Sequence, residues 1–483
     1  MKILFVSSEL APFAKTGGLG DVSAALPRQL HKDGHDVRVF VPFYSRIDLK
    51  GRDFVVDFVR HVPVNIGPHS YSFSLFTSEL PGSDLRVYFV HCPVLYERPG
   101  IYSSDVDEHL RFLVLIRAAL ESCQRMGWAP DIAHANDWQT ALLPLTLRTA
   151  YGWDRLFAHT KTVLTIHNLQ YQGMFPASTL VDTGLGDYAS FFHQDQLRAG
   201  VINYLLHGIL YADMVTTVSP TYAEEIQTEE FGAGLHPFLR ARRGGLVGIL
   251  NGIDDDEWNP ATDPLIPHHY TRDDLAGKEL NKQALLKALG LPYAPGVPVV
   301  GIVSRMASQK GFDLLFDVLP ALLARRPLRL VVLGNGDPRL EGFFEQLQRA
   351  FRQRVCFYNG FNNKLAHLIE AGSDIFLMPS RYEPCGLNQM YSLRYGTIPV
   401  VRRTGGLADT VELYNPRTGE GNGFVFDHYT AQGVRWGLEQ ALDAYLDPEH
   451  LAKLRQNGMA ADFSWRTQVH RYEEIYQQLT GAT

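Results

Sequence analysis

Two segments of the sequence place cationic side chains beside glycine, a combination that suits phosphate binding. In KTGGLGD, Lys15 precedes a glycine-rich turn that ends at Asp21, and in SRMASQKGFD, Arg305 and Lys310 share one loop. Glycine lets the backbone approach a ligand closely, and two cations can clamp a diphosphate. The first turn has neither the ending of a Walker loop nor a GxGxxG fingerprint, so the motif alone does not name its ligand. The alternative for both segments is an ordinary connection whose charges pair with surface acids.

A carboxylate shares the setting of these cations. The segment SDIFLMPSRYEPCGLNQ places Glu383 between an apolar strand-like run and a helix that opens at Gly386, and TGGLADT (404–410) follows another such run. Ligands of open α/β sheets bind at the carboxyl ends of the strands. We therefore expect Glu383 and glycine-rich amides to face the same opening as Arg305 and Lys310.

The elements that must position these residues alternate between strand-like and helical patterns, which is typical of a parallel α/β sheet. In the first half of the chain, strands are predicted at residues 2–8, 36–42, 85–91, 131–137, 161–168 and 213–219. Between residues 53 and 80 we expect an inserted hairpin at the sheet edge. In the second half, strands are predicted at residues 297–304, 328–334, 354–360, 373–380 and 397–403.

The length of 483 residues suits two large domains better than one core. A glycine- and arginine-rich link at 239–254 separates the two series of strands and indicates a boundary near residue 245. Near the C-terminus, apolar side chains recur at helical spacing, so the final helix must pack on another element. Its apolar face is formed by Val469, Tyr472, Tyr476 and Leu479.

Composition narrows the function classes. The formal net charge is -7 and charged residues make up 20% of the chain, so there is no basic field for nucleic acid or an anionic membrane. The four cysteines, Cys92, Cys123, Cys356 and Cys385, have neither disulfide-framework nor zinc-site spacing. No secretory leader or membrane-spanning apolar run is visible. We expect a soluble protein of the reducing cytoplasm that acts on a neutral or small-molecule substrate.

Six motifs, taken together and in order, resemble those of bacterial glycogen synthases and plant starch synthases over residues 1–480. They are KTGGLGD, IHNLQYQG (166–173), NGID (251–254), SRMASQKGFD, PSRYEPCGLNQ and RRTGGLADTV. The resemblance implies the GT-B fold, in which two Rossmann-like domains face each other across a deep cleft and a C-terminal helix crosses back to the first domain. It implies an acceptor-side domain of residues 1–245 plus 464–483, and a donor-side domain of residues 246–463.

The resemblance also implies an activity. Such enzymes transfer glucose from ADP-glucose to the non-reducing 4-hydroxyl of an α-1,4-glucan with retention of configuration, and they need no metal or other cofactor. It implies catalytic roles for Glu383, His167, Arg305 and Lys310, with the two cations meeting the charge of the departing diphosphate. Glu383 could act as the nucleophile of a double displacement. The family is usually described instead by front-face attack, in which this acid positions sugar hydroxyls and stabilises positive charge.

Binding residues follow from the same resemblance. The donor-binding set is Lys15, Gly18, Asn251, Arg305, Lys310, Gly386, Leu387, Thr404, Gly405 and Gly406. The acceptor and sugar-binding set is Asp21, Asp137, Trp138 and Tyr96. Tyr96 and Tyr358 could stack on a sugar or on adenine, although an aromatic residue in this setting is more often part of the core. Two positions depart from related patterns: Asn136 stands where the family often has histidine, and Tyr391 stands where many other GT-B enzymes have a second glutamate, which leaves ribose recognition unassigned.

Two other functions are alternatives to a glucan synthase. A non-catalytic glucan-binding protein would be expected to lose Glu383, Arg305 or Lys310, and all three are present. A glucan phosphorylase has a similar architecture but requires a lysine-bound pyridoxal phosphate, and the chain lacks the length and motifs of that family. The sequence leaves open ADP-glucose against UDP-glucose, the preferred glucan length, the oligomeric state and regulation.

Overall fold

The computed structural model describes residues 1–481, which form two compact units. The first unit comprises Met1–Gly252 together with the segment that starts at Trp465, and the second comprises Ile253–Ser464. The first unit extends past residue 245, because β12 (Leu246–Gly248) adds a strand to its sheet. Within the described residues, no helix is long and apolar enough to cross a membrane.

The first unit is built on a ten-stranded sheet with the order β12-β11-β8-β7-β1-β2-β6-β5-β3, and β4 pairs with β5 beside this path. Its strands are β1 (Lys2–Val6), β2 (Asp36–Pro42), β3 (Val55–Val56), β4 (Val62–Ile66), β5 (His69–Glu79), β6 (Arg86–His91), β7 (Ile132–Asn136), β8 (Lys161–Ile166), β11 (Met214–Thr217) and β12. The path from β12 to β6 is parallel, whereas β3, β4 and β6 pair antiparallel with β5. The β4–β5 hairpin therefore lies toward the sheet edge, as predicted.

All helices of the first unit except the last lie between these strands in the chain. They are α1 (Gly18–Lys32), α2 (Pro93–Tyr96), α3 (Glu108–Met126), α4 (Asp137–Thr140), α5 (Leu143–Arg148), α6 (Gln194–Arg198), α7 (Tyr204–Tyr211), α8 (Pro220–Glu225), α9 (His236–Ala241) and α18 (Trp465–Thr480). A separate two-stranded ribbon joins β9 (Met174–Pro176) to β10 (Val201–Asn203).

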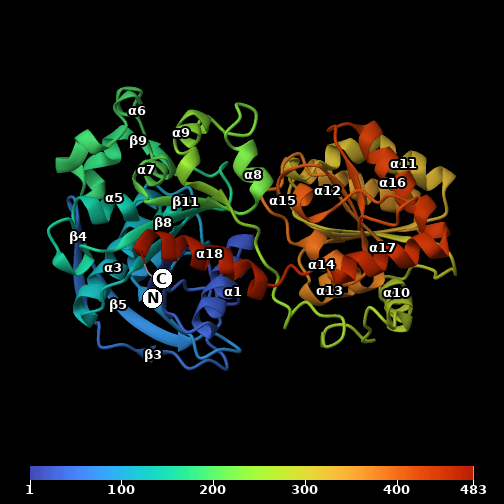
Figure 1. Cartoon of the computed structure of the whole chain (residues 1–483), viewed down its shortest axis with the longest axis horizontal. Helices are drawn as coiled ribbons and strands as arrows, with labels where there is room; N and C mark the ends of the chain where they lie inside the picture. Colours follow the sequence, from blue (N-terminus) through green and yellow to red (C-terminus); the bar gives the residue numbers. More distant parts are fainter. Residues whose placement is uncertain (482–483) are drawn as a thin grey trace. The chain divides into compact units, whose positions relative to one another are not determined.

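The last helix, α18, completes the first unit although it comes from the far end of the chain. It runs beside α1 (Figure 1) and buries Val469, Tyr472 and Tyr476 of its predicted apolar face. The hydroxyl of Tyr476 lies 2.7 Å from Nδ1 of His134 on β7. This contact ties the C-terminal helix to the centre of the sheet.

The second unit has a fully parallel six-stranded sheet with the order β15-β14-β13-β16-β17-β18. Its strands are β13 (Val299–Val303), β14 (Arg329–Gly334), β15 (Val355–Asn359), β16 (Ile375–Met378), β17 (Ile398–Arg402) and β18 (Phe424–Phe426). Its helices are α10 (Ala276–Ala288), α11 (Leu315–Arg325), α12 (Pro338–Ala350), α13 (Asn363–Gly372), α14 (Asn388–Arg394), α15 (Gly405–Thr410), α16 (Ala431–Leu446) and α17 (Pro448–Ala460).

Alternating side chains of the second sheet fill two separate cores. Leu330 and Val332 of β14 pack in a cluster with residues of α11, α12 and α16. Val331 and Leu333 of the same strand pack with residues of α10 and α13. Successive side chains of a strand point to opposite faces, so both faces of this sheet are covered by helices.

Each sheet has a point at which the strand order reverses. In the first unit it lies between β1 and β7, and in the second it lies between β13 and β16. Doubly wound sheets bind ligands at the carboxyl ends of the strands beside such a reversal. Three of the six sequence motifs follow strands of these pairs: KTGGLGD follows β1, SRMASQKGFD follows β13 and PSRYEPCGLNQ follows β16, whereas IHNLQYQG, NGID and RRTGGLADTV follow β8, β12 and β17.

Candidate active site

A buried acid, Glu9, organises the glycine-rich turn of the first unit. Glu9 lies three residues after the end of β1. Glu9 is only 3% exposed, and its Oε2 accepts hydrogen bonds from the amides of Thr16 (2.7 Å) and Gly17 (3.2 Å). Its Oε1 accepts from the Thr16 hydroxyl at 2.6 Å. These amides therefore serve the fold of the turn, and Gly18, which is exposed, follows them at the start of α1.

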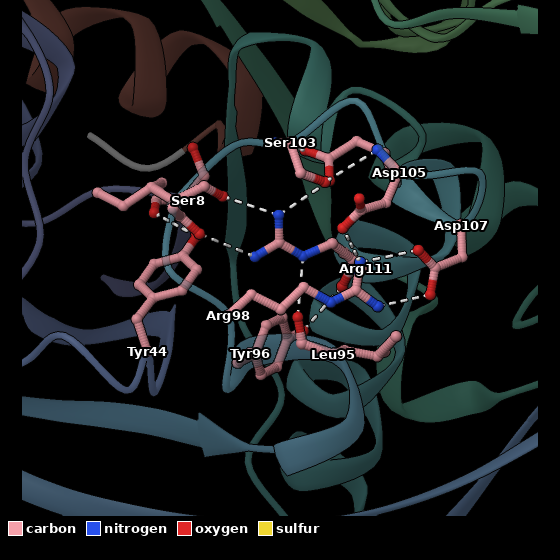
Figure 2. Close-up of polar contacts among 12 residues, drawn as sticks. Ser8, Tyr44, Leu95, Tyr96, Arg98, Ser103, Asp105, Asp107 and Arg111 are labelled. Atoms are coloured by element: carbon pink, nitrogen blue, oxygen red, sulfur yellow. Dashed lines mark hydrogen bonds and ion pairs between the residues drawn. The ribbon is translucent and has the colours of Figure 1, made fainter.

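Behind the turn, a second chain segment supports Glu9. The Tyr102 hydroxyl donates to Oε1 of Glu9 at 2.6 Å. The loop that carries Tyr102 is fixed by the fully buried guanidinium of Arg111, which donates to the carbonyl of Leu95 at 2.9 Å (Figure 2). The same guanidinium donates to the carbonyl of Ile101 at 2.9 Å and pairs with Glu108 at 2.8 Å. A carboxylate partner and carbonyl acceptors compensate the cost of burying this cation.

The structure corrects the expectation for Tyr96. This side chain is fully buried, and its hydroxyl donates to the Arg111 carbonyl at 2.8 Å (Figure 2). Its ring lies edge-on to Tyr44, with centroids 5.9 Å apart. Burial leaves Tyr96 no surface for a sugar, so it is a core residue of the support beneath the turn.

Within the turn itself, Lys15 and Asp21 form an ion pair. The Lys15 ammonium lies 2.6 Å from Oδ1 of Asp21, and both side chains are partly exposed. The stem of Lys15 lies against Gly20, where an added Cβ would be 3.0 Å from Cγ of Lys15. Asp21 therefore orders the turn by holding Lys15.

The carboxyl ends of β7 and β8 bring Asp137 and His167 together. Oδ1 of Asp137 accepts hydrogen bonds from the amides of His167 (2.6 Å) and Asn168 (3.3 Å). Asp137 has a φ of 55°, an uncommon backbone conformation for a residue other than glycine. Burial raises the pKa of Asp137 to about 7 against the opposing effect of these two amides, and burial lowers the pKa of His167 to about 3.

Trp138, beside Asp137, packs into an aromatic cluster with Phe112, Phe175 and Tyr204. Gly173 of the IHNLQYQG motif has a φ of 62°, and a Cβ there would lie 2.3 Å from Trp138 Cε3. The motif glycine is thus required by close approach to this ring.

Asn251 lies one residue before the end of the first chain segment of the first unit, Met1–Gly252, and is 5% exposed. Among the described residues its Oδ1 has no hydrogen-bond partner. Since buried polar atoms are nearly always paired, this oxygen is a candidate contact for a ligand.

In the second unit, the strand-order reversal brings a cation and a carboxylate into contact. The Lys310 ammonium, on the short 3-10 helix Ser308–Lys310 after β13, lies 2.7 Å from Oε2 of Glu383, which follows β16. The Ser380 hydroxyl donates to the same oxygen at 2.9 Å, and Glu383 is 5% exposed. Arg305, on the loop with Lys310, is exposed.

The glycines of TGGLADT pack against the backbone of the acid segment. A Cβ at Gly405 would lie 1.9 Å from the Glu383 carbonyl oxygen, and one at Gly406 would lie 2.1 Å from that of Cys385. The amide of Gly406 donates to the Glu383 carbonyl at 3.1 Å. The structure thus directs this amide to the protein backbone, and not to the opening expected from the sequence, because the two segments pack too closely for anything else.

Other predicted donor contacts lie around the same segment. Gly386 has a φ of 70°, Leu387 accepts the Tyr391 amide at 3.0 Å, and Thr404 is a buried residue directly before α15. The Tyr391 ring stacks on Trp258 with centroids 3.8 Å apart.

Sequence reasoning missed Glu9 and Ser380, and it noted Asn136 without giving it a role. Each is polar, buried and placed at the carboxyl end of a strand. The signal for Glu9 was an acid directly after an apolar strand, but its partners lie in a turn and a distant loop that the sequence alone does not bring together.

Comparisons with known proteins agree with this geometry. Residues 2–241 match the family described as Starch synthase catalytic domain, and residues 292–460 match Glycosyl transferases group 1. The glycogen synthase of Geotalea daltonii is 46% identical over 99% of this chain and 98% of its own length. That of Myxococcus xanthus is 45% identical over 100% of both chains.

Solved structures show the same relationship. The catalytic domain of Starch Synthase IV from Arabidopsis thaliana, bound to ADP and acarbose, is 36% identical over 99% of both chains, with a TM-score of 0.92. The sucrose-phosphate synthase of Thermosynechococcus elongatus is 18% identical with a TM-score of 0.62 and shares the fold. The chain has the GT-B fold of two Rossmann-like units and belongs to the glycogen synthase and starch synthase family of hexosyltransferases.

Proposed function

We propose that the protein transfers glucose from ADP-glucose to the 4-hydroxyl group at the non-reducing end of an α-1,4-glucan, with retention of configuration. The observation that carries this proposal is the contact between Lys310 and Glu383 at the strand-order reversal of the second unit, with Arg305 on the same loop. The ADP and acarbose bound to the related starch synthase support a nucleoside diphosphate and an α-glucan as ligands.

The cations would stabilise the leaving group. As the bond from glucose to diphosphate breaks, negative charge grows on the phosphate oxygens. Arg305 and Lys310 supply fixed positive charge from one loop, so the protein itself meets the charge that accumulates in the transition state. Because of these cations, we propose that no metal or other cofactor takes part.

Glu383 would serve the transferred sugar. Lys310 and Ser380 both hold its Oε2, which fixes the carboxyl group in one orientation. A fixed carboxylate of this kind can bind sugar hydroxyls and stabilise a glucosyl cation while the acceptor hydroxyl attacks the face that the diphosphate leaves. Within the first unit, the residues proposed to contact ligands are Lys15 and Gly18 for phosphate, His167 for a glucosyl group, and Asp137 with Trp138 for the acceptor glucan.

We propose the cytoplasm as the location of the protein. The four cysteines are free, and free thiols support the proposal of a reducing compartment.

Turnover with each nucleotide sugar tests the proposal. Purified protein should transfer glucose from ADP-glucose to glycogen and extend the chains by α-1,4 links, with slower transfer from UDP-glucose. The Glu383→Gln variant should lack activity under the same conditions. Glucan binding without transfer would favour the non-catalytic alternative, and activity that needs phosphate and pyridoxal phosphate would favour a phosphorylase.

A further inference from the structure

The carboxyl ends of β7 and β8 place the side chains of Asn136 and His167 in direct contact. Oδ1 of Asn136 lies 3.0 Å from Nε2 of His167. Both side chains are buried, at 1% and 8% exposure. Neither the motifs nor the comparisons give Asn136 a role.

Only one orientation of the Asn136 amide satisfies both of its neighbours. Its other polar atom, Nδ2, lies 3.1 Å from the carbonyl oxygen of Val6 at the end of β1. A carbonyl oxygen only accepts hydrogen bonds, so the NH₂ group must face Val6 and Oδ1 must face His167. Oδ1 is itself only an acceptor, and Nε2 of His167 must therefore carry the ring proton.

The consequence falls on the opposite ring nitrogen. A neutral imidazole with its proton on Nε2 has a lone pair on Nδ1. Burial lowers the pKa of His167 to about 3, so the ring is neutral at physiological pH. Among the described residues, the His167 side chain makes its hydrogen bond through Nε2, which leaves Nδ1 without a protein partner. The ring thus offers a ligand an acceptor and no donor.

We propose that Asn136 is a positioning residue that locks His167 in the Nε2–H tautomer, so that Nδ1 accepts a hydrogen bond from a hydroxyl group of the transferred sugar. The second part rests on the proposed function. The side chain of asparagine does not titrate. Its amide group also cannot flip while its NH₂ group donates to the Val6 carbonyl. The acceptor character of Nδ1 is therefore independent of pH in the working range.

Nitrogen NMR of histidine-labelled protein tests the tautomer directly. Ring-nitrogen shifts distinguish the two tautomers, and the His167→Gln variant assigns the signal. Wild-type His167 should show the Nε2–H pattern, and Asn136→Leu, which removes the acceptor at similar size, should give a tautomer mixture. An Nδ1–H pattern in the wild type, or an unchanged pattern in Asn136→Leu, would overturn the proposal.

Thr165→Val is the matched control. Thr165 is buried on β8 and bonds to His134 (2.6 Å) and Thr216 (2.7 Å), not to His167. The variant loses buried hydrogen bonds in the same strands but should keep the His167 pattern and the wild-type kcat. The ring-nitrogen shifts of His167 could instead change as much in Thr165→Val as in Asn136→Leu. That result would mean that any damage to β8 has the same effect, and it would also overturn the proposal.

A substrate cycle tests the hydroxyl contact. In ADP-glucose analogues with fluorine in place of the 3-, 4- or 6-hydroxyl, fluorine accepts but cannot donate a hydrogen bond. For one analogue, wild-type kcat/KM should fall by about 10-fold or more relative to ADP-glucose, which is the scale of one lost hydrogen bond to a buried acceptor. The kcat/KM of Asn136→Leu should fall by a smaller factor on the same replacement. Equal losses in both proteins for all three analogues would overturn the contact. A wild type that cannot use ADP-glucose at all would instead refute the proposed function, and the NMR result would stand apart from it.

Discussion

The ammonium of Lys310 lies 2.7 Å from Oε2 of Glu383, although the two residues follow different strands of the second sheet. The contact forms because β13 and β16 are neighbours at the point where the strand order reverses. The Lys310 cation compensates the desolvation cost of the buried Glu383 carboxylate, and the carboxylate holds the ammonium in one position. Loss of either partner should therefore have consequences beyond its own role in catalysis.

Replacing the cations should separate catalysis from stability. Lys310→Met and Arg305→Met should each lower kcat by about 100-fold or more, the scale of one lost electrostatic contact to the transition state. Only Lys310→Met should also destabilise the second unit, because it leaves the buried Glu383 carboxylate without its partner. Steady-state kinetics and denaturant unfolding measure the two effects. Arg325→Met, at an exposed position on α11, is the control and should change neither.

Glu383→Gln should abolish turnover while leaving ADP binding intact. Glutamine keeps the shape and can still accept from Ser380, but it loses the negative charge that would stabilise a glucosyl cation. Removing the carboxylate also frees the Lys310 ammonium for the diphosphate. Calorimetry should therefore give an ADP affinity equal to or tighter than that of the wild type. Near-normal kcat in Glu383→Gln would contradict the assigned role, and Glu345→Gln, an exposed acid of the same unit, serves as the control.

Much of this architecture could be predicted from the sequence, and the reason is periodicity. The runs at 36–42 and 329–334 form strands because apolar and β-branched side chains fit both covered faces of a parallel sheet. Boundaries were less accurate, as at β12, where a three-residue strand after the glycine-rich link extends the first unit beyond residue 245.

The site was predictable where charge and glycine stand together in one motif, and less so where partners come from separate segments. Lys310 and Glu383 belong to recognisable motifs, and the sheet topology brings them together. Glu9 depends on Tyr102, which is remote in sequence, and on a loop that Arg111 fixes from inside. The sequence left Tyr96 open between a sugar contact and a core residue, because an aromatic ring looks the same in sequence in either place.

Metal removal should leave the activity unchanged. Arg305 and Lys310 provide the positive charge that a divalent cation supplies in many sites that transfer phosphoryl groups. Turnover of ADP-glucose should therefore be equal before and after dialysis against excess EDTA. A loss of activity that added Mg²⁺ or Mn²⁺ restores would show that the two side chains do not suffice.

Glu9 should control donor binding through the shape of the glycine-rich turn. Glu9→Leu removes the acceptors of the Thr16 and Gly17 amides and should raise the KM for ADP-glucose by about 10-fold. Glu9→Gln should cost less than about 3-fold, because its oxygen can serve the amides while the Thr16 and Tyr102 hydroxyls rotate to accept from its NH₂ group. Equal kinetic losses in the two variants would indicate that the charge matters, and not the hydrogen bonds.

Asp137 should make the stability of the first unit depend on pH. Burial raises its pKa from 3.8 to about 7 in the folded protein. Between these values the unfolded chain has released its proton while the folded chain keeps it, so the unfolded state binds fewer protons. The free energy of unfolding therefore falls as pH rises from about 4 to 7, and the full cost of the buried charge, on the order of 2–4 kcal/mol, is present above pH 7.

The Asp137→Asn variant removes this cost without disturbing the geometry. Asparagine accepts the His167 and Asn168 amides through its own Oδ1 and tolerates the φ of 55° at this position. The variant should match the wild type near pH 4 and exceed its stability increasingly up to pH 8. Denaturant unfolding at several pH values measures the difference, and hydrogen exchange of the β7 and β8 amides assigns it to the first unit. If the difference in unfolding free energy between the variant and the wild type does not change with pH, Asp137 does not titrate in this range. If the variant is more stable but has a lower kcat, the reaction uses the carboxylate of Asp137, which is then retained although it destabilises the fold.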